Sequence, residues 1–350
     1  MKKLVLFVVV VVGLGLAIRF TLNRRKAEPA APAPVKTPIP PVVEHVPPAK
    51  REPPPPAEKP APPVPVEPEP RIKGATLVSS ATVQWFAPGP GVVYYCEDGQ
   101  VMAAPKSGGT PRIVGDCKSA FDFVADADGV MYCDDDKLKR ITAGTEGSHV
   151  VVEGIDCIMM AVDSKYAYYV LPGYDDVDNP GVYRVSRTGG TPERIHATRP
   201  KEQFGIVNDG AQIWISAWSA GTIAKLPKTP NAKPTTVIAN QKGLVDFDVD
   251  DTYLYWYVEG SGVVRRRKKV GGPIEVVGHD VDQEPIVVAD GHAYWFETGP
   301  GPNKRLVHLA PGAKQTEVLA IDLHAPSLRA DAEGVYVSEL DREGIFMFKR

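Results

Sequence analysis

The chain has 350 residues, of which 43% are hydrophobic, and its formal net charge at pH 7 is −3. This apolar content is enough for a large folded core. Residues 72–350 carry 29 basic and 37 acidic side chains, which argues against a nucleic-acid partner because such a partner requires a basic face.

Residues 1–26 predict a transmembrane signal anchor. Leu4–Ile18 is an uninterrupted apolar run, and a short apolar stretch after Arg19 extends it to about 19 residues, or roughly 28 Å as a helix. A cleaved signal peptide, the alternative, requires a small-residue cleavage site directly behind its apolar core, whereas the basic residues 24–26 follow here. We therefore expect a single-pass anchor in the cell inner membrane, with the rest of the chain periplasmic or otherwise extracytoplasmic.

Residues 27–71 form a Pro-rich segment that we expect to be a disordered linker. Pro recurs every second or third residue, as in Pro53–Pro56, and few apolar residues are present to bury a core. Such a segment stays unfolded but stiff, close to polyproline II, and extends by roughly 3.1 Å per residue. Its composition resembles the Pro-rich spacers of TonB-type cell-envelope proteins, which implies a spacer that holds a head domain away from the membrane. A passive tether and a PxxP ligand are the alternatives.

Residues 72–350 contain a sequence tag that recurs seven times. An Asp, an Asn or an equivalent residue is followed, five or six residues later, by an aromatic-rich β-strand such as Leu254–Tyr257. Intervals of 37 to 45 residues separate the copies, which is the length that four short strands and their turns require. The aligned strand ends are Tyr95, Tyr132, Tyr169, Trp214, Trp256, Trp295 and Val337.

The repeat predicts an all-β, seven-bladed β-propeller, with a six-bladed ring as the alternative. Each unit reads as four strands, here named a to d from the inside of the ring outward. The last copy ends at a third strand, Gly344–Arg350, and lacks strand d. Residues 74–79 resemble the d strands and precede the first strand a. We therefore expect this N-terminal strand to complete the last blade and to close the ring, which removes exposed sheet edges.

Two copies of the tag also resemble the repeats of the YWTD family of propellers, which occur in low-density-lipoprotein-type receptors and in bacterial envelope proteins. The residues that carry this resemblance are Leu254–Arg266 and Ala293–Phe296. Most copies here lack the Thr-Asp that completes the motif, and that family usually has six blades rather than seven. The resemblance implies a non-enzymatic binding platform.

Four cysteines fall within the first two repeats and their connections. Cys96 and Cys133 occupy the same place directly after strand b, and Cys117 and Cys157 follow 21 and 24 residues later, near the end of strand d. The ends of strands b and d lie on the same face of a four-stranded meander. Repeat equivalence therefore predicts the pairs Cys96–Cys117 and Cys133–Cys157 among the three pairings that four cysteines allow. Disulfides persist in oxidising compartments, in agreement with an exported head.

Other charged clusters are interpreted as structural. The Asp-rich segments 126–128 and 246–251 recur near a–b turns, which turn chemistry explains better than calcium binding. The basic run Arg265–Lys269 is expected to be a solvated strand edge, with an anionic docking patch as the alternative. The histidines are scattered without metal-ligand spacing, and no nucleotide-binding or Ser-hydrolase motif is present. We predict no catalytic residue, no metal and no cofactor.

The b–c loops are the candidate partner-binding surface, because binding residues concentrate on loops of a rigid scaffold. The longest repeat has its extra residues between strands b and c, and two other b–c loops carry an aromatic or basic residue. The candidates are Tyr174, Asp175, Asp176, Asp178, Trp218 and Lys304.

These features together predict a membrane-anchored, extracytoplasmic propeller that serves as a non-enzymatic protein-interaction platform in the cell envelope. Two other classes remain open. One is a sensor that binds a small molecule or a glycan. The other is a metal-dependent lyase or lactone hydrolase, which would require a cluster of carboxylates and histidines at the mouth of the channel.

Overall fold

The computed structural model describes residues 72 and 74–350, except 156, 158, 172–178, 199–201, 203, 282–284, 300–302, 325 and 340–343. The predicted anchor and linker therefore lie outside the described residues. Within the described part of the chain all regular elements are strands, and no helix there is long and apolar enough to span a membrane.

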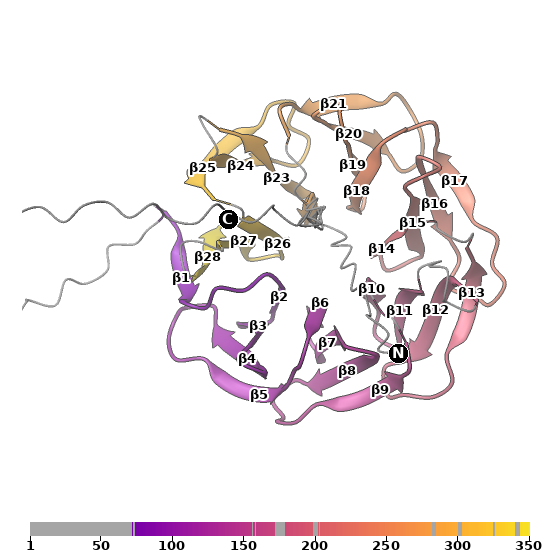
Figure 1. Cartoon of the computed structure of the whole chain (residues 1–350). Coiled ribbons are helices and arrows are strands. Elements are labelled where there is room, and N and C mark those ends of the chain that lie inside the picture. Colours follow the sequence, from indigo (N-terminus) through magenta and orange to yellow (C-terminus); the bar gives the residue numbers. More distant parts are fainter. Residues whose placement is uncertain are drawn as a thin grey trace, which may run out of the picture. The chain divides into compact units, whose positions relative to one another are not determined.

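The strands form seven four-stranded antiparallel sheets, which stand as blades around a central channel (Figure 1). This confirms the seven-bladed ring and excludes the six-bladed alternative. Blades 1 to 3 comprise β2 (Phe86–Gly89), β3 (Val92–Glu97), β4 (Gln100–Pro105) and β5 (Arg112–Asp116), then β6 (Ala120–Asp126), β7 (Gly129–Asp134), β8 (Lys137–Thr142) and β9 (His149–Glu153), then β10 (Met160–Val162), β11 (Tyr166–Leu171), β12 (Gly181–Ser186) and β13 (Glu193–Ala197). Blades 4 to 6 comprise β14 (Phe204–Asn208), β15 (Ile213–Ala217), β16 (Thr222–Leu226) and β17 (Thr235–Ile238), then β18 (Leu244–Val249), β19 (Tyr253–Val258), β20 (Val263–Lys268) and β21 (Glu275–Gly278), then β22 (Val287–Ala289), β23 (His292–Thr298), β24 (Lys304–Leu309) and β25 (Glu317–Leu323).

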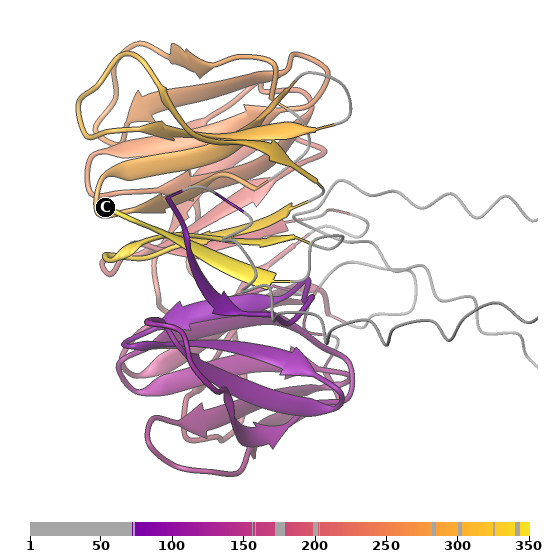
Figure 2. The ribbon, with the colours of Figure 1, turned by 90° about the vertical axis from the view of Figure 1, so that its left-hand side faces the viewer.

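The seventh blade is built from both ends of the described chain. It contains β26 (Pro326–Ala330), β27 (Gly334–Glu339) and β28 (Gly344–Lys349), and β1 (Thr76–Ser79) adds to the outer edge of β28. Figure 2 shows β1, in indigo, lying against the yellow C-terminal strands. The predicted closure by the N-terminal strand is confirmed, and the ring has no unpaired end blade.

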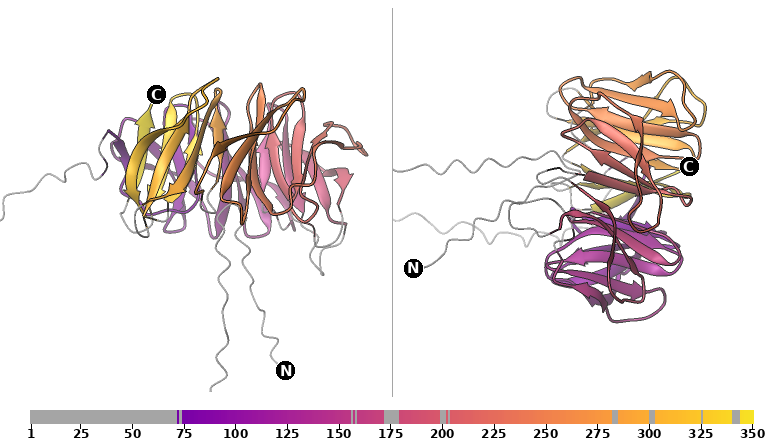
Figure 3. Two further views of the ribbon diagram at one scale, coloured as in Figure 1. Left: turned by 90° about the horizontal axis from the view of Figure 1, so that it is seen from above. Right: turned by 90° about the vertical axis from the view of Figure 1, so that its right-hand side faces the viewer.

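The core lies between the blades, in a flat disc whose thickness is about the length of the strands (Figure 3). All seven aligned tag residues fall on the second strand of a blade and are at most 1% exposed. A second strand is covered by neighbouring blades on both faces, which explains why the tag is rich in aromatic and β-branched side chains.

The aspartates of the a–b turns explain why the sequence tag begins with an Asp or an Asn. Asp209 accepts backbone N–H groups from Ala211 and Gln212, and its second oxygen accepts the indole N–H of Trp214 at 2.6 Å. Asp163 holds its own turn in the same way and accepts the hydroxyl of Tyr168 at 2.8 Å. The Asp therefore fixes the a–b turn and satisfies the polar atom of the buried aromatic five residues later.

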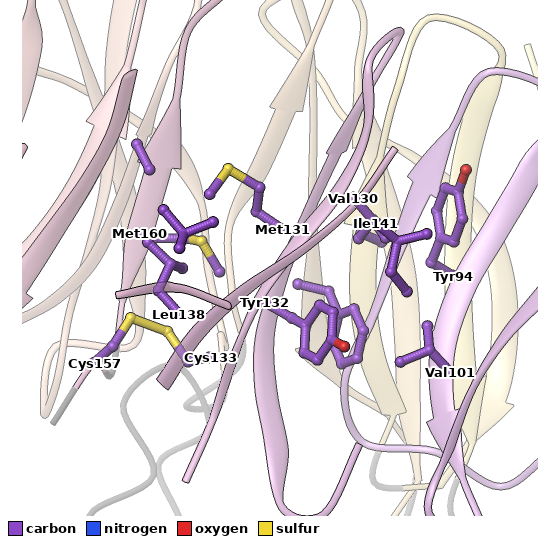
Figure 4. Packing of buried hydrophobic residues seen from close by; sticks show 14 of the residues in the cluster. Tyr94, Val101, Val130, Met131, Tyr132, Cys133, Leu138, Ile141, Cys157 and Met160 are labelled. Atoms are coloured by element: carbon purple, nitrogen blue, oxygen red, sulfur yellow. A yellow bond between two sulfur atoms is a disulfide. The ribbon is translucent and has the colours of Figure 1, made fainter. Parts of the chain in front are cut away.

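Both predicted disulfides are present, Cys96–Cys117 and Cys133–Cys157. Each joins the second strand of a blade to the segment that follows its fourth strand. Figure 4 shows the Cys133–Cys157 bridge beside Leu138 in the hydrophobic core. Blades 1 and 2 are thus covalently stapled on the face that carries the b–c loops.

Candidate functional site

A cavity of about 370 Å³ occupies the channel and is the candidate functional site. The first strands of all seven blades contribute to its wall, so the ring places residues from distant parts of the sequence around one space. Most of the wall is apolar, but four charged side chains line it. These are Asp122, Asp246, Asp248 and Arg329.

Two of these aspartates lie at irregularities of the inner strands. The pairing of β6 with β7 shifts between Phe121 and Val124, and Asp122 within that bulge has a φ of 51°. The pairing of β18 with β19 shifts between Leu244 and Asp246. A bulge turns side chains away from their regular alternation, and bulges are frequent beside functional sites.

The prediction that the Asp-rich segment 246–251 serves turn chemistry is wrong for Asp246 and Asp248. They do not form part of a turn, because both lie within β18 and line the channel, while Phe247 between them packs into the interblade core. The period of two along a strand accounts for this arrangement. Asp250 does hold a turn, because its carboxylate accepts the amides of Thr252 and Tyr253 at 2.6 and 2.5 Å.

The channel carboxylates bond to the inner strand of the next blade. Asp246 accepts the amide of Ile286 at 2.8 Å, and Asp248 accepts the amide of Val288 at 2.7 Å. Asp122 accepts the amide of Met160 in the same manner. An inner strand pairs with only one neighbour, so its other edge presents backbone groups that need partners. The aspartates provide these partners and tie adjacent blades together.

Burial shifts the pKa values of these groups. Although the channel leaves part of each side chain accessible, the surrounding protein raises the pKa of Asp122 and of Asp246 to about 6, and that of Asp248 to about 7. Backbone amides oppose the increase at all three carboxyls, and Arg329 also opposes it at Asp122 and Asp246. Shifts of this size are common at functional sites but also occur in structural networks.

Arg329 supplies the positive charge of the channel. Its guanidinium donates to the carbonyl of Leu328 at 2.8 Å and lies 5.8 Å from the ring centre of Trp85, where a cation–π attraction acts. Burial lowers the pKa of Arg329, while the three aspartates act in the opposite direction. Arg329 therefore serves all three carboxylates as a shared counter-charge.

The predicted partner-binding residues have different outcomes. Tyr174, Asp175, Asp176 and Asp178 lie outside the described residues. Trp218 is half-buried rather than exposed, because it packs against the blade 4–5 core and donates its indole N–H to Ser216 at 3.1 Å. Lys304 begins β24 and pairs with Thr298 across the hairpin.

The basic run on β20 is not a solvated edge, which corrects a second prediction. Arg266 donates to Glu275 at 2.8 Å and is buried, and Arg267 donates to the carbonyl of Val237 in the preceding blade at 2.8 Å. Arg265 reaches Gln241 at 2.6 Å, and Lys269 reaches Asp209 at 2.7 Å. These four side chains of the run all make contacts within or between blades, and only Lys268 is exposed.

No group of three or more His, Cys, Asp or Glu side chains with metal-binding geometry occurs among the described residues. Among the described residues that line the cavity there is no histidine. The carboxylates of the channel come from blades 2 and 5, and no feature of the sequence marked them as neighbours.

No family model matches the chain, and no curated protein matches it. Solved structures match it in fold. Virginiamycin B lyase from Staphylococcus aureus is 11% identical, with a TM-score of 0.59 over 79% of this chain and 98% of that chain. YCF48 from Cyanidioschyzon merolae is 10% identical, with a TM-score of 0.56 over 78% and 97%. YCF48 bound to D1 peptide is also 10% identical, with a TM-score of 0.54 over 78% and 94%. At these identities the likeness is one of fold alone.

Proposed function

We propose that the protein is a membrane-anchored, extracytoplasmic interaction platform that binds a protein partner without catalysing a reaction. One observation carries the proposal: the channel carboxylates bond to amides of the adjacent blade. Asp246 and Asp248 bridge blade 5 to blade 6, and Asp122 bridges blade 2 to blade 3. Groups engaged in this way stiffen the ring, and a stiff ring is a suitable base for binding loops.

The contact surface in this proposal is the face that carries the b–c loops. Both disulfides fasten their blades at this face, which fixes the loops nearby. A solved propeller of similar fold, YCF48, has a bound D1 peptide, and this supports peptide or protein recognition as a use of such a ring.

The anchor and linker complete the proposal. Residues 1–26 would hold the chain in the inner membrane, and residues 27–71 would let the head search the periplasm. Alkaline extraction and protease protection test this arrangement. Full-length protein should stay with membranes and be digested only when the outer side is opened, while a chain that begins at residue 27 should not reach the membrane.

The platform is tested by a photo-reactive residue placed at one position at a time in living cells. Ser219 is exposed in the b–c turn of blade 4, and Lys314 is exposed in the c–d turn of blade 6 on the opposite face. We expect a reproducible crosslink to one envelope protein from Ser219 and none from Lys314. Crosslinks from Lys314 alone, or only within the chain itself, would refute the proposed surface.

A lyase is the second candidate, favoured by Asp248. Its pKa of about 7 suits proton transfer at neutral pH, and it lines the channel with a second carboxylate and an arginine. A virginiamycin B lyase has a similar fold. Incubation of the protein with a streptogramin B antibiotic, followed by mass analysis, tests this candidate. Turnover that Asp248→Asn abolishes would establish it, and an unchanged substrate would support the platform.

A further inference from the structure

Two histidines of blade 6 face each other at the side of the ring. His292 opens β23 and His308 lies on the adjacent strand β24, in antiparallel pairing. His292 Nδ1 lies 2.6 Å from His308 Nε2, and the two ring planes differ by only 10°. One hydrogen therefore lies between the two nitrogens. The N–H of one ring and the lone pair of the other point at each other.

Glu317 fixes the orientation of this pair. Its Oε1 lies 2.5 Å from His308 Nδ1, on the far side of the ring from His292. His308 Nδ1 donates its hydrogen to the carboxylate, so His308 Nε2 carries the lone pair that points at His292. A histidine whose second nitrogen is held by a carboxylate is the arrangement that orients and strengthens metal ligands in proteins.

Three charged side chains surround the pair. Arg350 lies close enough to His292 to act on it electrostatically. Arg350 is itself paired with Asp290 at 3.1 Å, and Glu317 is mostly exposed. The two carboxylates against one arginine leave a formal negative charge beside the pair. Tyr294 packs parallel to His308 at 4.8 Å and limits its rotation.

We propose that His292 and His308 bind one late first-row transition-metal dication, through His292 Nδ1 and His308 Nε2, with Glu317 as the positioning residue. The hydrogen of His292 moves from Nδ1 to Nε2, which frees the Nδ1 lone pair for the metal while both imidazoles stay neutral, and waters complete the coordination. Imidazole nitrogens bind such metals at about 2.0–2.1 Å. Because the two nitrogens point at each other without the metal, the His292 ring has to turn until its Nδ1 points at a metal bound to His308 Nε2. The order of stability for nitrogen sites predicts tighter binding of Cu²⁺ than of Ni²⁺ or Zn²⁺.

The site is independent of the platform and of the channel. Only two side chains would coordinate directly, and no cluster of three or more such ligands occurs among the described residues. It would add a metal-dependent contact at the rim of blade 6, where the C-terminal Arg350 bonds to blade 6 at Asp290.

Isothermal titration of the full-length protein, free of tags and treated with a chelator, tests the proposal with CuCl₂ and ZnCl₂ as the only ligands. We expect one ion per chain and tighter binding of Cu²⁺ than of Zn²⁺. His292→Gln and His308→Gln should each remove binding, and Glu317→Gln should weaken it roughly 10- to 100-fold.

His149→Gln is the matched control, because His149 is exposed on the outer strand of blade 2, away from this pair. Unfolding curves that coincide with the unsubstituted protein establish that each variant is folded. Binding that survives both His292→Gln and His308→Gln, or that His149→Gln weakens equally, would overturn the proposal.

Discussion

Lys269 Nζ lies 2.7 Å from Asp209 Oδ2, and this contact joins blade 5 to the a–b turn of blade 4. Both side chains are largely buried, with exposures of 15% and 5%. Equivalent cations one or two residues after a third strand reach the turn carboxylate of the preceding blade elsewhere in the ring. These pairs are Lys106–Asp331, Arg187–Asp126, Lys228–Asp163 and Arg350–Asp290.

This contact between a cation and a turn carboxylate, here called the clasp, is absent at the boundary between blades 1 and 2, where both partners are missing. Blade 2 has Ala143 where the cation would stand, with its amide bonded to the a–b turn as Lys269 is. The a–b turn of blade 1 is Pro90–Gly91, without a carboxylate. At the boundary between blades 5 and 6 only the cation is missing, because Ala310 follows β24 while Asp250 stays in the a–b turn of blade 5.

Lys269→Met should lower the free energy of unfolding by about 2 kcal/mol, because it leaves Asp209 buried without its cation. Lys118→Met is the control, since Lys118 pairs with Asp135 at 2.7 Å but is 82% exposed. Its cost should be much smaller than that of Lys269→Met, because solvent screens an exposed pair. Urea unfolding measures both, and equal costs would show that the clasp does not stabilise the ring.

The Cys96→Ser/Cys117→Ser double variant should lose about 3 kcal/mol of stability, because the bridge closes a loop with a sequence separation of 21. Thermal unfolding with and without a reductant measures the loss. The double variant should no longer respond to reduction at this bridge, so its remaining response reports Cys133–Cys157. An unsubstituted protein whose unfolding ignores the reductant would contradict the staple.

Stability should fall as the pH rises, because the folded ring holds protons on channel carboxyls that the unfolded chain releases. The pKa of Asp248 is raised from 3.8 to about 7, so its contribution is complete below pH 4 and is lost as the pH passes 7. Asp248→Asn should flatten the fall between pH 4 and 7 in urea unfolding. A slope that is unchanged by the substitution would place the titrating group elsewhere.

A chain that begins at residue 80 lacks β1 and should self-associate, because the edge of β28 is then unpaired. It also loses buried Val78 and the bond between the Ser79 and Tyr95 hydroxyls at 2.8 Å. Light scattering after size exclusion measures the mass. A chain that begins at residue 72 is the control and should be monomeric, whereas equal masses would show that β1 is dispensable.

Features that repeat within the sequence were predictable. The closure by β1 and the pairing of Cys96 with Cys117 follow from comparing one copy of the repeat with another. The roles of Asp246 and Asp248 were missed because aspartates near a turn resemble turn residues, and only the bounds of β18 place them on the channel wall.

The interblade contacts were missed for a different reason. Lys269 and Asp209 are 60 residues apart, and no local pattern joins them. A signal did exist, since a cation follows the third strand in most copies. The position of Arg329 among carboxylates of blades 2 and 5 had no such signal, because only the closed ring brings these blades together.

The central claim is that the b–c loop face, and not the channel, carries the function. The most direct test is the partner crosslink from Lys304, measured in cells for two variants of the full-length protein. The proposal predicts that Ser219→Arg lowers its yield at least tenfold, which corresponds to about 1.4 kcal/mol, and that Asp246→Asn/Asp248→Asn leaves it unchanged. A yield that survives Ser219→Arg but is lost with the channel variant would contradict the platform and place the function in the channel.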